Sequence, residues 1–257
     1  MWQSYRAYCI ASLAALCLSL TAISPATSDM DDSVDMMWGN TQVLCDGAGH
    51  QMVSLSHDCW TTSAFRSKSK YLFGRFDIDI KLVPKDSAGT GTTVYRKGDR
   101  EMQYRLWFDP TEDFNTYSII WNPHMILILV NGVPIRWMRN QMRDDTPFPL
   151  YQPMRLYASI WDADEWATQG GRIKTDWSHG PFTAFFRNYT ANACVPYNRA
   201  WICGQDSGDS SWFNQELDEQ GQQKLNDVNG KNKIYDYCTD SRRFPNGYPP
   251  ECGHSKS

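Results

Sequence analysis

The stretch MILILV-NG-VPIRW (Met125 to Trp137) decides the fold class of this chain. Two apolar runs of β type flank a two-residue connection, and Asn131-Gly132 suits the positive φ angles of a type I′ turn. The stretch therefore predicts a tight β-hairpin. Tyr117 to Trp121 leads into it through Asn122-Pro123, which predicts another strand directly before the hairpin.

Short β-type segments continue on the N-terminal side of the hairpin. Gln51 to Leu55 (QMVSL) and Phe73 to Val83 (FGRFDIDIKLV) alternate apolar and polar side chains, as half-buried strands do. From about Val43 to Trp161, many such segments are separated by turn residues. This pattern is typical of a β-sandwich or barrel.

The sequence changes in character after Trp177, where turns and cysteines replace the alternating pattern. Glu219 to Val228 (EQGQQKLNDV) predicts one helix, with Asn229-Gly230 as its C-cap. The apolar face of this helix is thin, so we expect it to lean on the sandwich. Phe244 to Cys252 (FPNGYPPEC) is rich in Pro and Gly and predicts irregular structure that disulfides would hold in place.

The composition of the 257 residues supports a packed, folded chain. Hydrophobic residues make up 41% and aromatic residues 14%, which argues against disorder over most of the chain. The 11 Trp and 13 Tyr provide flat side chains that fill cores and also stack on sugar rings. The formal net charge is -4 and no Lys/Arg cluster stands out, so we expect no nucleic-acid partner.

The N-terminal residues are typical of an export signal. Arg6 supplies a positive charge, Tyr8 to Leu20 supplies an apolar run, and small residues follow at Ala26-Thr27-Ser28. The sequence thus predicts a signal peptide over residues 1–28 and a secreted protein. A signal anchor is the alternative, but the apolar run is short for a membrane span, so we expect no membrane attachment.

Cysteine usage agrees with export. Four cysteines lie late in the chain without any C-x-x-C spacing: Cys194, Cys203, Cys238 and Cys252. Histidine is scarce and shows no ligand spacing, so we expect no metal site and no cofactor. Disulfides are expected in an oxidising compartment, and the sequence alone leaves three pairings of four cysteines open. Asn188-Tyr189-Thr190 is an N-glycosylation sequon.

Paired carboxylates are the remaining candidates for chemistry, because no G-x-S-x-G, Gly-rich phosphate loop or H-E-x-x-H motif is present. Asp77 and Asp79 share one strand face, and a retaining glycosidase needs two carboxyls about 5 to 5.5 Å apart. The preferred interpretation is an ordinary amphipathic strand, because apolar residues occupy the alternate positions. The acidic run at Asp162, Asp164 and Glu165 fits sugar-hydroxyl binding and a solvated loop about equally well.

Seven blocks of sequence cover nearly all of the chain beyond the leader. They are SKYLFGRFDIDIKLVPKDSAGT (Ser69 to Thr90), GDRE (Gly98 to Glu101), LWFDPTEDFNTYSIIWNP (Leu106 to Pro123), QPMRLYASIWDADEWATQGGRIKTDWS (Gln152 to Ser178), ANAC (Ala191 to Cys194), WFNQELD (Trp212 to Asp218) and YCTDSRRFPNGYPPEC (Tyr237 to Cys252). In this order they resemble the plant xyloglucan endotransglucosylase/hydrolases of glycoside hydrolase family sixteen. The resemblance implies an all-β, concanavalin-like β-jelly-roll sandwich over 29–190, whose concave face holds the polysaccharide. It implies a disulfide-bonded extension with a short helix over 191–257.

The resemblance also implies a retaining mechanism, in which one Glu attacks the glucan and a second Glu protonates the leaving chain. Both lie on one strand that reads approximately HDEIDFEF. This chain lacks that strand, because Tyr95 is followed directly by Arg96 and the GDRE block. Loss of both carboxylates predicts an inactive chain. The gap corresponds to two strands, so we expect TTVY and REMQYRLWF to join as a hairpin, with facing core residues losing partners.

Individual roles are carried over from the resemblance alone. Substrate binding is implied for three groups: Asp99, Arg100 and Glu101; Glu165, Trp166 and Gly170; and Arg243. Disulfides are implied for two pairs: Cys194 with Cys203, and Cys238 with Cys252. The implied partner is xyloglucan, as polysaccharide or oligosaccharide. The implied setting is the cell wall or apoplast, with a monomeric chain glycosylated at Asn188.

Three hypotheses are ranked in this order. The chain is a family member inactivated by the gap, either as a truncated isoform or as a mis-joined gene model. Alternatively, it is a non-catalytic glucan-binding protein of the wall. Last, it is an active hydrolase that uses Asp77 and Asp79.

Overall fold

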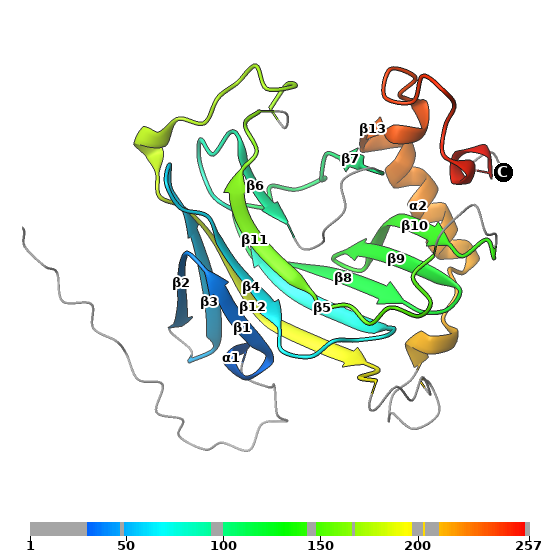
Figure 1. Cartoon of the computed structure of the whole chain (residues 1–257), viewed down its shortest axis with the longest axis horizontal. Helices are drawn as coiled ribbons and strands as arrows, with labels where there is room; N and C mark the ends of the chain where they lie inside the picture. The colour runs from blue at the N-terminus through cyan, green and yellow to red at the C-terminus, as the bar shows by residue number, and fades with distance from the viewer. Residues whose placement is uncertain are drawn as a thin grey trace, which may run out of the picture.

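The computed structural model describes residues 30–46, 49–93, 100–142, 148–165, 168–196, 203 and 211–254. Two antiparallel sheets stack into a β-sandwich, a helix lies beside strand β10 (Val133–Arg139), and a small third sheet lies near one end of that helix, as Figure 1 shows. The predicted all-β jelly-roll class is confirmed, as is the disulfide-bonded C-terminal extension with a short helix. The predicted leader lies outside the described residues.

The larger sheet has seven strands. In spatial order they are β10, β9 (Met125–Val130), β8 (Asn115–Trp121), β5 (Gly74–Lys81), β12 (Phe182–Ala193), β3 (Gln51–His57) and β2 (Asn40–Cys45). The predicted hairpin is formed by β9 and β10, and its turn residues Asn131 and Gly132 have φ angles of 50° and 74°. Positive φ at both positions confirms the type I′ turn expected from Asn-Gly.

Strand β12 was not predicted from the sequence. It runs for 12 residues between β5 and β3, so the expectation of turns and one helix after Trp177 is wrong for this segment. Its buried residues Phe182, Ala184 and Phe186 alternate as in any half-buried strand. A register shift after Arg187 then breaks the alternation, which hid the strand in the sequence.

The smaller sheet has four strands. In spatial order they are β1 (Val34–Trp38), β4 (Ser63–Ser67), β11 (Tyr157–Asp162) and β6 (Thr90–Thr93). Phe65 of β4 meets Phe186 of β12 edge to face, with ring centroids 5.2 Å apart, so the core lies between the two sheets. Alternate residues of a strand point to opposite faces, so Ala64 and Arg66 face outward.

A third, two-stranded sheet pairs β7 (Met102–Tyr104) with β13 (Lys233–Asp236). Strand β6 pairs with β11 instead, so β6 and β7 lie in different sheets. The predicted hairpin between TTVY and REMQYRLWF is therefore wrong in the described parts of these segments. The physical reason is that β13, from far along the chain, satisfies the backbone groups of β7.

The predicted helix is α2 (Glu219–Lys231), which is longer than expected. It begins after Asp218, whose side chain accepts the backbone N–H of Gly221 at 2.7 Å. It continues through Gly230 to Lys231 and is capped by Asn232, so the predicted Asn229-Gly230 cap is wrong. Asn232 exchanges backbone and side-chain hydrogen bonds with Arg105, which holds this last turn.

The helix leans on the sandwich as predicted. It packs against β10, and its buried residues are Leu225 and Val228. The remaining elements are short: α1 (Met30–Ser33), η1 (Trp177–His179), η2 (Ser211–Asn214), η3 (Tyr237–Thr239) and η4 (Pro250–His254). Within the described ranges, every helix is too short or too polar to cross a membrane.

The interior of the sandwich is unevenly covered. Phe76 and Ile78 of β5 are buried, at 6% and 3% exposure. Their register partners on β8, Ile119 and Tyr117, share the same face but are only partly buried. Ile128 on β9, the partner of Ile119, is also only partly buried. The inner face around Ile119 and Ile128 therefore has less cover than that of β5, whereas Val130, the partner of Tyr117, is fully buried.

Candidate substrate-binding face

The outward face of the four-stranded sheet carries side chains from three neighbouring strands. Trp38 of β1 is the register partner of Ala64 in β4, and Ala64 is the partner of Ser159 in β11. Directly opposed residues share a face, so all three point outward. Trp161 lies further along β11, beside Gly91 of β6, where a Cβ atom would come within 3.3 Å of the indole. Two indoles on one sheet face make a surface suited to flat sugar rings.

The loop after β11 is organised by the carboxylate of Asp164. Its Oδ2 accepts a hydrogen bond from the backbone N–H of Thr175 at 3.2 Å, and its Oδ1 accepts one from Nζ of Lys174 at 3.0 Å. These bonds hold the pKa of Asp164 below its ordinary value, and the bond from the Thr175 backbone makes the largest contribution. Asp164 thus shapes the loop, whereas the neighbouring Glu165 is exposed.

Two ion pairs join the segment before β7 to the C-terminal extension. Nε of Arg100 donates to Oε1 of Glu251. Nη1 of Arg243 donates to Oε2 of Glu101, and its Nη2 lies 3.3 Å from Oε1 of the same carboxylate. The hydrogen bond to Glu101 raises the pKa of the Arg243 guanidinium. This two-point contact orients the guanidinium as well as neutralising it.

The carboxylate of Glu251 is the least exposed of these four charged side chains, at 17%. Its Oε1 also accepts the hydroxyl of Tyr237 at 3.2 Å. Burial alone would raise the pKa of Glu251, but the hydrogen bond and charge of Arg100 outweigh it, and the net shift is downward. Burial, together with the charge of Glu251, raises the pKa of Tyr237 to about 12. At neutral pH the pair is therefore a carboxylate and a neutral phenol.

Asp77 and Asp79 lie on the face of β5 that points away from the core, because the residues that alternate with them are buried. Asp77 accepts a hydrogen bond from Oγ of Ser118 at 2.5 Å. Asp79 accepts bonds from Oγ1 of Thr116 at 2.7 Å and Nδ2 of Asn188 at 2.8 Å. This geometry supports the interpretation as an ordinary amphipathic strand, on the side away from the smaller sheet.

The residues predicted to bind substrate fall into three sets. One set is joined by the ion pairs described above: Arg100, Glu101 and Arg243. A second set lies exposed on the loop after β11: Glu165 and Gly170. The third set lies outside the described residues: Asp99 and Trp166.

Sequence reasoning missed Glu251 and Trp38. Glu251 lies in the Pro-rich C-terminal stretch, where no periodicity marks a buried position. Simple alternation from Val34 would place Trp38 on the inner face of β1. A register shift between Met36 and Trp38 turns it outward, and the exposed indole is the signal of that shift.

The cysteine pairs are those that the resemblance implies. Disulfides join Cys194 to Cys203 and Cys238 to Cys252, with Cα–Cα distances of 5.6 and 5.3 Å. Cys59 is a free, exposed thiol. Asn188 of the sequon is exposed on β12.

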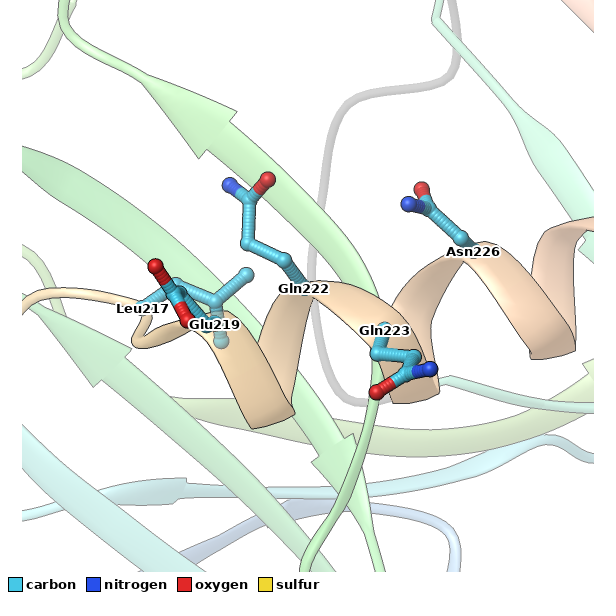
Figure 2. A pocket seen from close by; sticks show the side chains of 5 residues that line it. All are labelled: Leu217, Glu219, Gln222, Gln223 and Asn226. Atoms are coloured by element: carbon cyan, nitrogen blue, oxygen red, sulfur yellow. The ribbon is translucent and has the colours of Figure 1, made fainter.

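Figure 2 shows a pocket at the beginning of α2. It is lined by Leu217, Glu219, Gln222, Gln223 and Asn226. One carboxylate and three amides provide no acid/base pair, so this pocket is not a catalytic candidate. In the described parts of the chain, no three His, Cys, Asp or Glu side chains group as metal ligands.

Comparisons with known proteins agree with this architecture. Residues 30–99 and 92–179 match Glycosyl hydrolases family 16, and residues 207–252 match the Xyloglucan endo-transglycosylase (XET) C-terminus. The probable xyloglucan endotransglucosylase/hydrolase protein 23 of Arabidopsis thaliana is 41% identical over 285 residues, covering 97% of this chain and 98% of the relative. Xyloglucan endotransglucosylase protein 1 of Diospyros kaki is 42% identical, covering 85% of each chain.

Among solved structures, Crh5 transglycosylase in complex with NAG has a similar fold. It superposes with a TM-score of 0.51 at 20% sequence identity, covering 66% of this chain and 82% of that chain. The sandwich, the C-terminal extension and the long matches to curated relatives all lead to the same assignment. This chain belongs to the xyloglucan endotransglucosylase/hydrolases, within glycosyl hydrolases family 16.

Proposed function

We propose that this protein binds xyloglucan along the outward face of the four-stranded sheet and the adjoining C-terminal extension, and does not cleave it. The observation that carries the proposal is the short connection between β6 and β7. β6 ends at Thr93 and β7 begins at Met102, so only residues 94–101 separate them. The sequence of these residues, VYRKGDRE, lacks the acidic strand that the family resemblance implies.

Two features of the family match support the loss of a segment. The match to family 16 is divided into two stretches that meet at residues 92–99. The alignment with the Arabidopsis thaliana relative covers 285 positions, more than the 257 residues present here, so part of that alignment has no counterpart in this chain. Both features agree with a segment missing between Tyr95 and Arg96.

The uneven interior gives independent support. The hydroxyl of Tyr117 is buried without a hydrogen-bond partner in the described structure. Ile119 and Ile128, on the same face, are only partly buried. A sandwich that lacks two strands over β8 and β9 would leave such residues with fewer neighbours.

Three carboxylates beside the proposed binding face are engaged by cations, whereas retaining cleavage needs a nucleophile and an acid/base about 5 to 5.5 Å apart. Glu101 and Glu251 are each held by an arginine, and Asp164 is held by Lys174. Hydrogen bonds, among them those from Arg100 and Lys174, hold the pKa values of Glu251 and Asp164 below their ordinary values, so neither group carries the acid's proton at neutral pH. We therefore expect neither transglycosylase nor hydrolase activity.

In this proposal the remaining polar residues contact sugar hydroxyls, and the exposed indoles stack on sugar rings. The proposed contacts come from the segment before β7, from the loop after β11 and from the extension: Asp99, Arg100, Glu101, Glu165, Trp166, Gly170 and Arg243. Xyloglucan is the proposed partner because the curated relatives are named for it. The protein is proposed to bind it as a monomer.

The proposal includes a place for the protein in the cell. Residues 1–28 are proposed as a signal peptide, 29–190 as the jelly-roll domain and 191–257 as the extension. The protein is then secreted to the cell wall or apoplast and glycosylated at Asn188. The disulfides seen among the described residues and the exposed position of Asn188 support this oxidising, glycosylating route.

The test combines two assays on the full chain, secreted from a eukaryotic host with its disulfides formed. Native gel electrophoresis with xyloglucan in the gel measures binding as retardation. Incubation with xyloglucan and a fluorescent xyloglucan oligosaccharide measures transfer as label that enters the polymer. We expect retardation without incorporation of label.

The Diospyros kaki relative, run in parallel, shows that the transfer assay detects activity. Incorporation of label by this chain would contradict the proposed inactivity. Unretarded migration of the folded protein in xyloglucan gels would contradict the proposed binding.

A further inference from the structure

Two tryptophans lie exposed at the edge of the sandwich and do not pack in its core. Trp60, in the turn between β3 and β4, is 90% exposed, and Trp38, at the end of β1, is 51% exposed. Tryptophan is a residue that proteins mostly bury, because exposing its large apolar surface to water is costly. Two exposed indoles close together in the fold indicate a binding surface more than a packing feature.

Both tryptophans lie close to Ser63, the residue at which β4 begins. Nε1 of Trp38 donates a hydrogen bond to Oγ1 of Thr62 at 3.1 Å, and Trp60 lies two residues before Thr62 in the chain. Gly39 follows Trp38 with φ at 82°, and a Cβ atom there would lie 1.9 Å from the carbonyl oxygen of Thr62. Only glycine lets the end of β1 approach this turn so closely.

This edge continues the proposed binding face. Trp38 stands in the outward row that contains Ala64 and Ser159, on the sheet face that carries Trp161. Strand β1 is the edge of the four-stranded sheet opposite to β6. Figure 1 shows β1 on the side of the molecule away from β7 and β13. A chain that crosses this face from the extension would reach Trp38 at the β1 edge, where its indole contacts Thr62 in the turn that also holds Trp60.

The turn that holds Trp60 is already ordered. Oδ1 of Asp58 accepts the backbone N–H groups of Trp60 and Thr61, each at 2.8 Å, and the hydroxyl of Thr61 at 2.9 Å. The backbone N–H of Asp58 donates to the carbonyl of Thr61 at 3.1 Å. A turn fixed in this way loses little conformational entropy when a ligand binds.

We infer that Trp38 and Trp60 form an additional sugar-stacking subsite at the β1 edge, which lengthens the binding face for the backbone of a neutral, β-linked polysaccharide. The inference rests on the proposed function and adds to it the residues that hold the far end of the chain. The indole N–H of Trp38 is engaged by Thr62, so the ring offers its apolar face. The carboxylate of Asp58, beside Trp60, keeps its negative charge but accepts hydrogen bonds within its own turn, so the indoles are the groups that remain to contact a neutral sugar.

The test measures retardation in native gels that contain polymeric xyloglucan, and competition by a short xyloglucan oligosaccharide. Trp60→Ala should weaken binding of the polymer about two- to tenfold, the range expected for losing one aromatic contact. A short oligosaccharide that fills only the centre of the face should bind the variant and the wild type equally. Trp38→Phe, which keeps an aromatic ring, should lose less than Trp38→Ala.

Tyr151→Ala is the matched control. Tyr151 is 77% exposed, but it lies near Met154, which bridges to Tyr71 beyond the opposite end of β4. Equal retardation of the wild type and Trp60→Ala would overturn the subsite and leave the proposed function intact. Absence of retardation for the wild type would overturn both. If the wild type is a dimer in solution and Trp60→Ala is a monomer, the two tryptophans contact a second copy of the chain. That result would overturn the subsite.

Discussion

Arg243 and Glu101, which are 142 residues apart in the chain, form a two-point ion pair between the C-terminal extension and the segment before β7. The side chains are 33% and 30% exposed, so the pair is partly screened by water. Beside it, Arg100 and Glu251 form a second pair between the same two segments. Side chains expected to touch sugar thus also hold the extension against the body of the protein.

The first prediction concerns the coupling of that pair. In a double-mutant cycle of Glu101→Gln and Arg243→Gln, we expect a coupling energy of about 0.5 to 1 kcal/mol, because partly exposed ion pairs contribute little. Urea unfolding provides the measurement. A parallel cycle of Glu165→Gln with Arg243→Gln should give no coupling, since Glu165 lies on the loop after β11. Equal coupling in both cycles would contradict the specific contact.

The second prediction is a pH dependence at Glu251. Its pKa is below the ordinary value of 4.5 in the folded protein, so the group stabilises the fold above pH 4.5 and loses that effect as the pH falls through its folded pKa. Glu251→Gln should destabilise the protein by about 1 kcal/mol at pH 7. The free energies of unfolding of variant and wild type should converge as the pH falls below the folded pKa of Glu251. A difference that is independent of pH would show that the carboxylate charge is not the cause.

The third prediction uses the unpartnered hydroxyl of Tyr117. Tyr117→Phe removes a buried polar group that has no hydrogen bond, so we expect a stability gain of up to about 1 kcal/mol. Thermal unfolding measures the effect. Tyr104→Phe is the control, because its hydroxyl donates to Asn229 at 3.0 Å and its loss should destabilise the protein. Destabilisation by both variants would show that Tyr117 is satisfied in solution.

The fourth prediction separates the two faces of the larger sheet. Asn substituted at both Asp77 and Asp79 should leave retardation by xyloglucan unchanged, because these carboxylates point away from the smaller sheet. Stability should fall by about 1 to 3 kcal/mol, since charge-assisted bonds from Ser118 and Thr116 are weakened. Transfer activity should be absent before and after the change. Wild-type activity abolished by the double substitution would restore the hypothesis of a hydrolase that uses this pair.

The fifth prediction concerns the disulfide between Cys238 and Cys252, which spans 14 residues of the extension. Serine at both positions should cost about 2 to 4 kcal/mol, because the unfolded extension gains conformational freedom. Hydrogen exchange should rise first in β13 and η4. Cys59→Ser should change neither stability nor exchange, as this thiol is free and exposed. Unchanged protection of β13 in the double variant would show that the ion pairs alone hold the extension.

Local patterns predicted the parts of the fold that depend on neighbours in the chain. The Asn131-Gly132 turn and the alternation in β5 arise from backbone preferences and burial within a few residues, and both appear as predicted. Strand β12 was missed because the bulge after Arg187 interrupts that alternation. The same kind of irregularity hid the outward position of Trp38.

Periodicity and covalent order are local properties, so they predicted a β-sandwich or barrel, one late helix and the direct junction of Tyr95 with Arg96. The family resemblance then implied the sandwich and the disulfide-bonded extension. The long-range partners are visible in the folded protein alone: β7 pairs with β13 instead of β6, Arg100 binds Glu251, and Arg243 binds Glu101. These contacts join residues more than a hundred positions apart. No local pattern specifies such partners. The choice depends on which backbone groups and charges still lack a partner when the rest of the chain has folded.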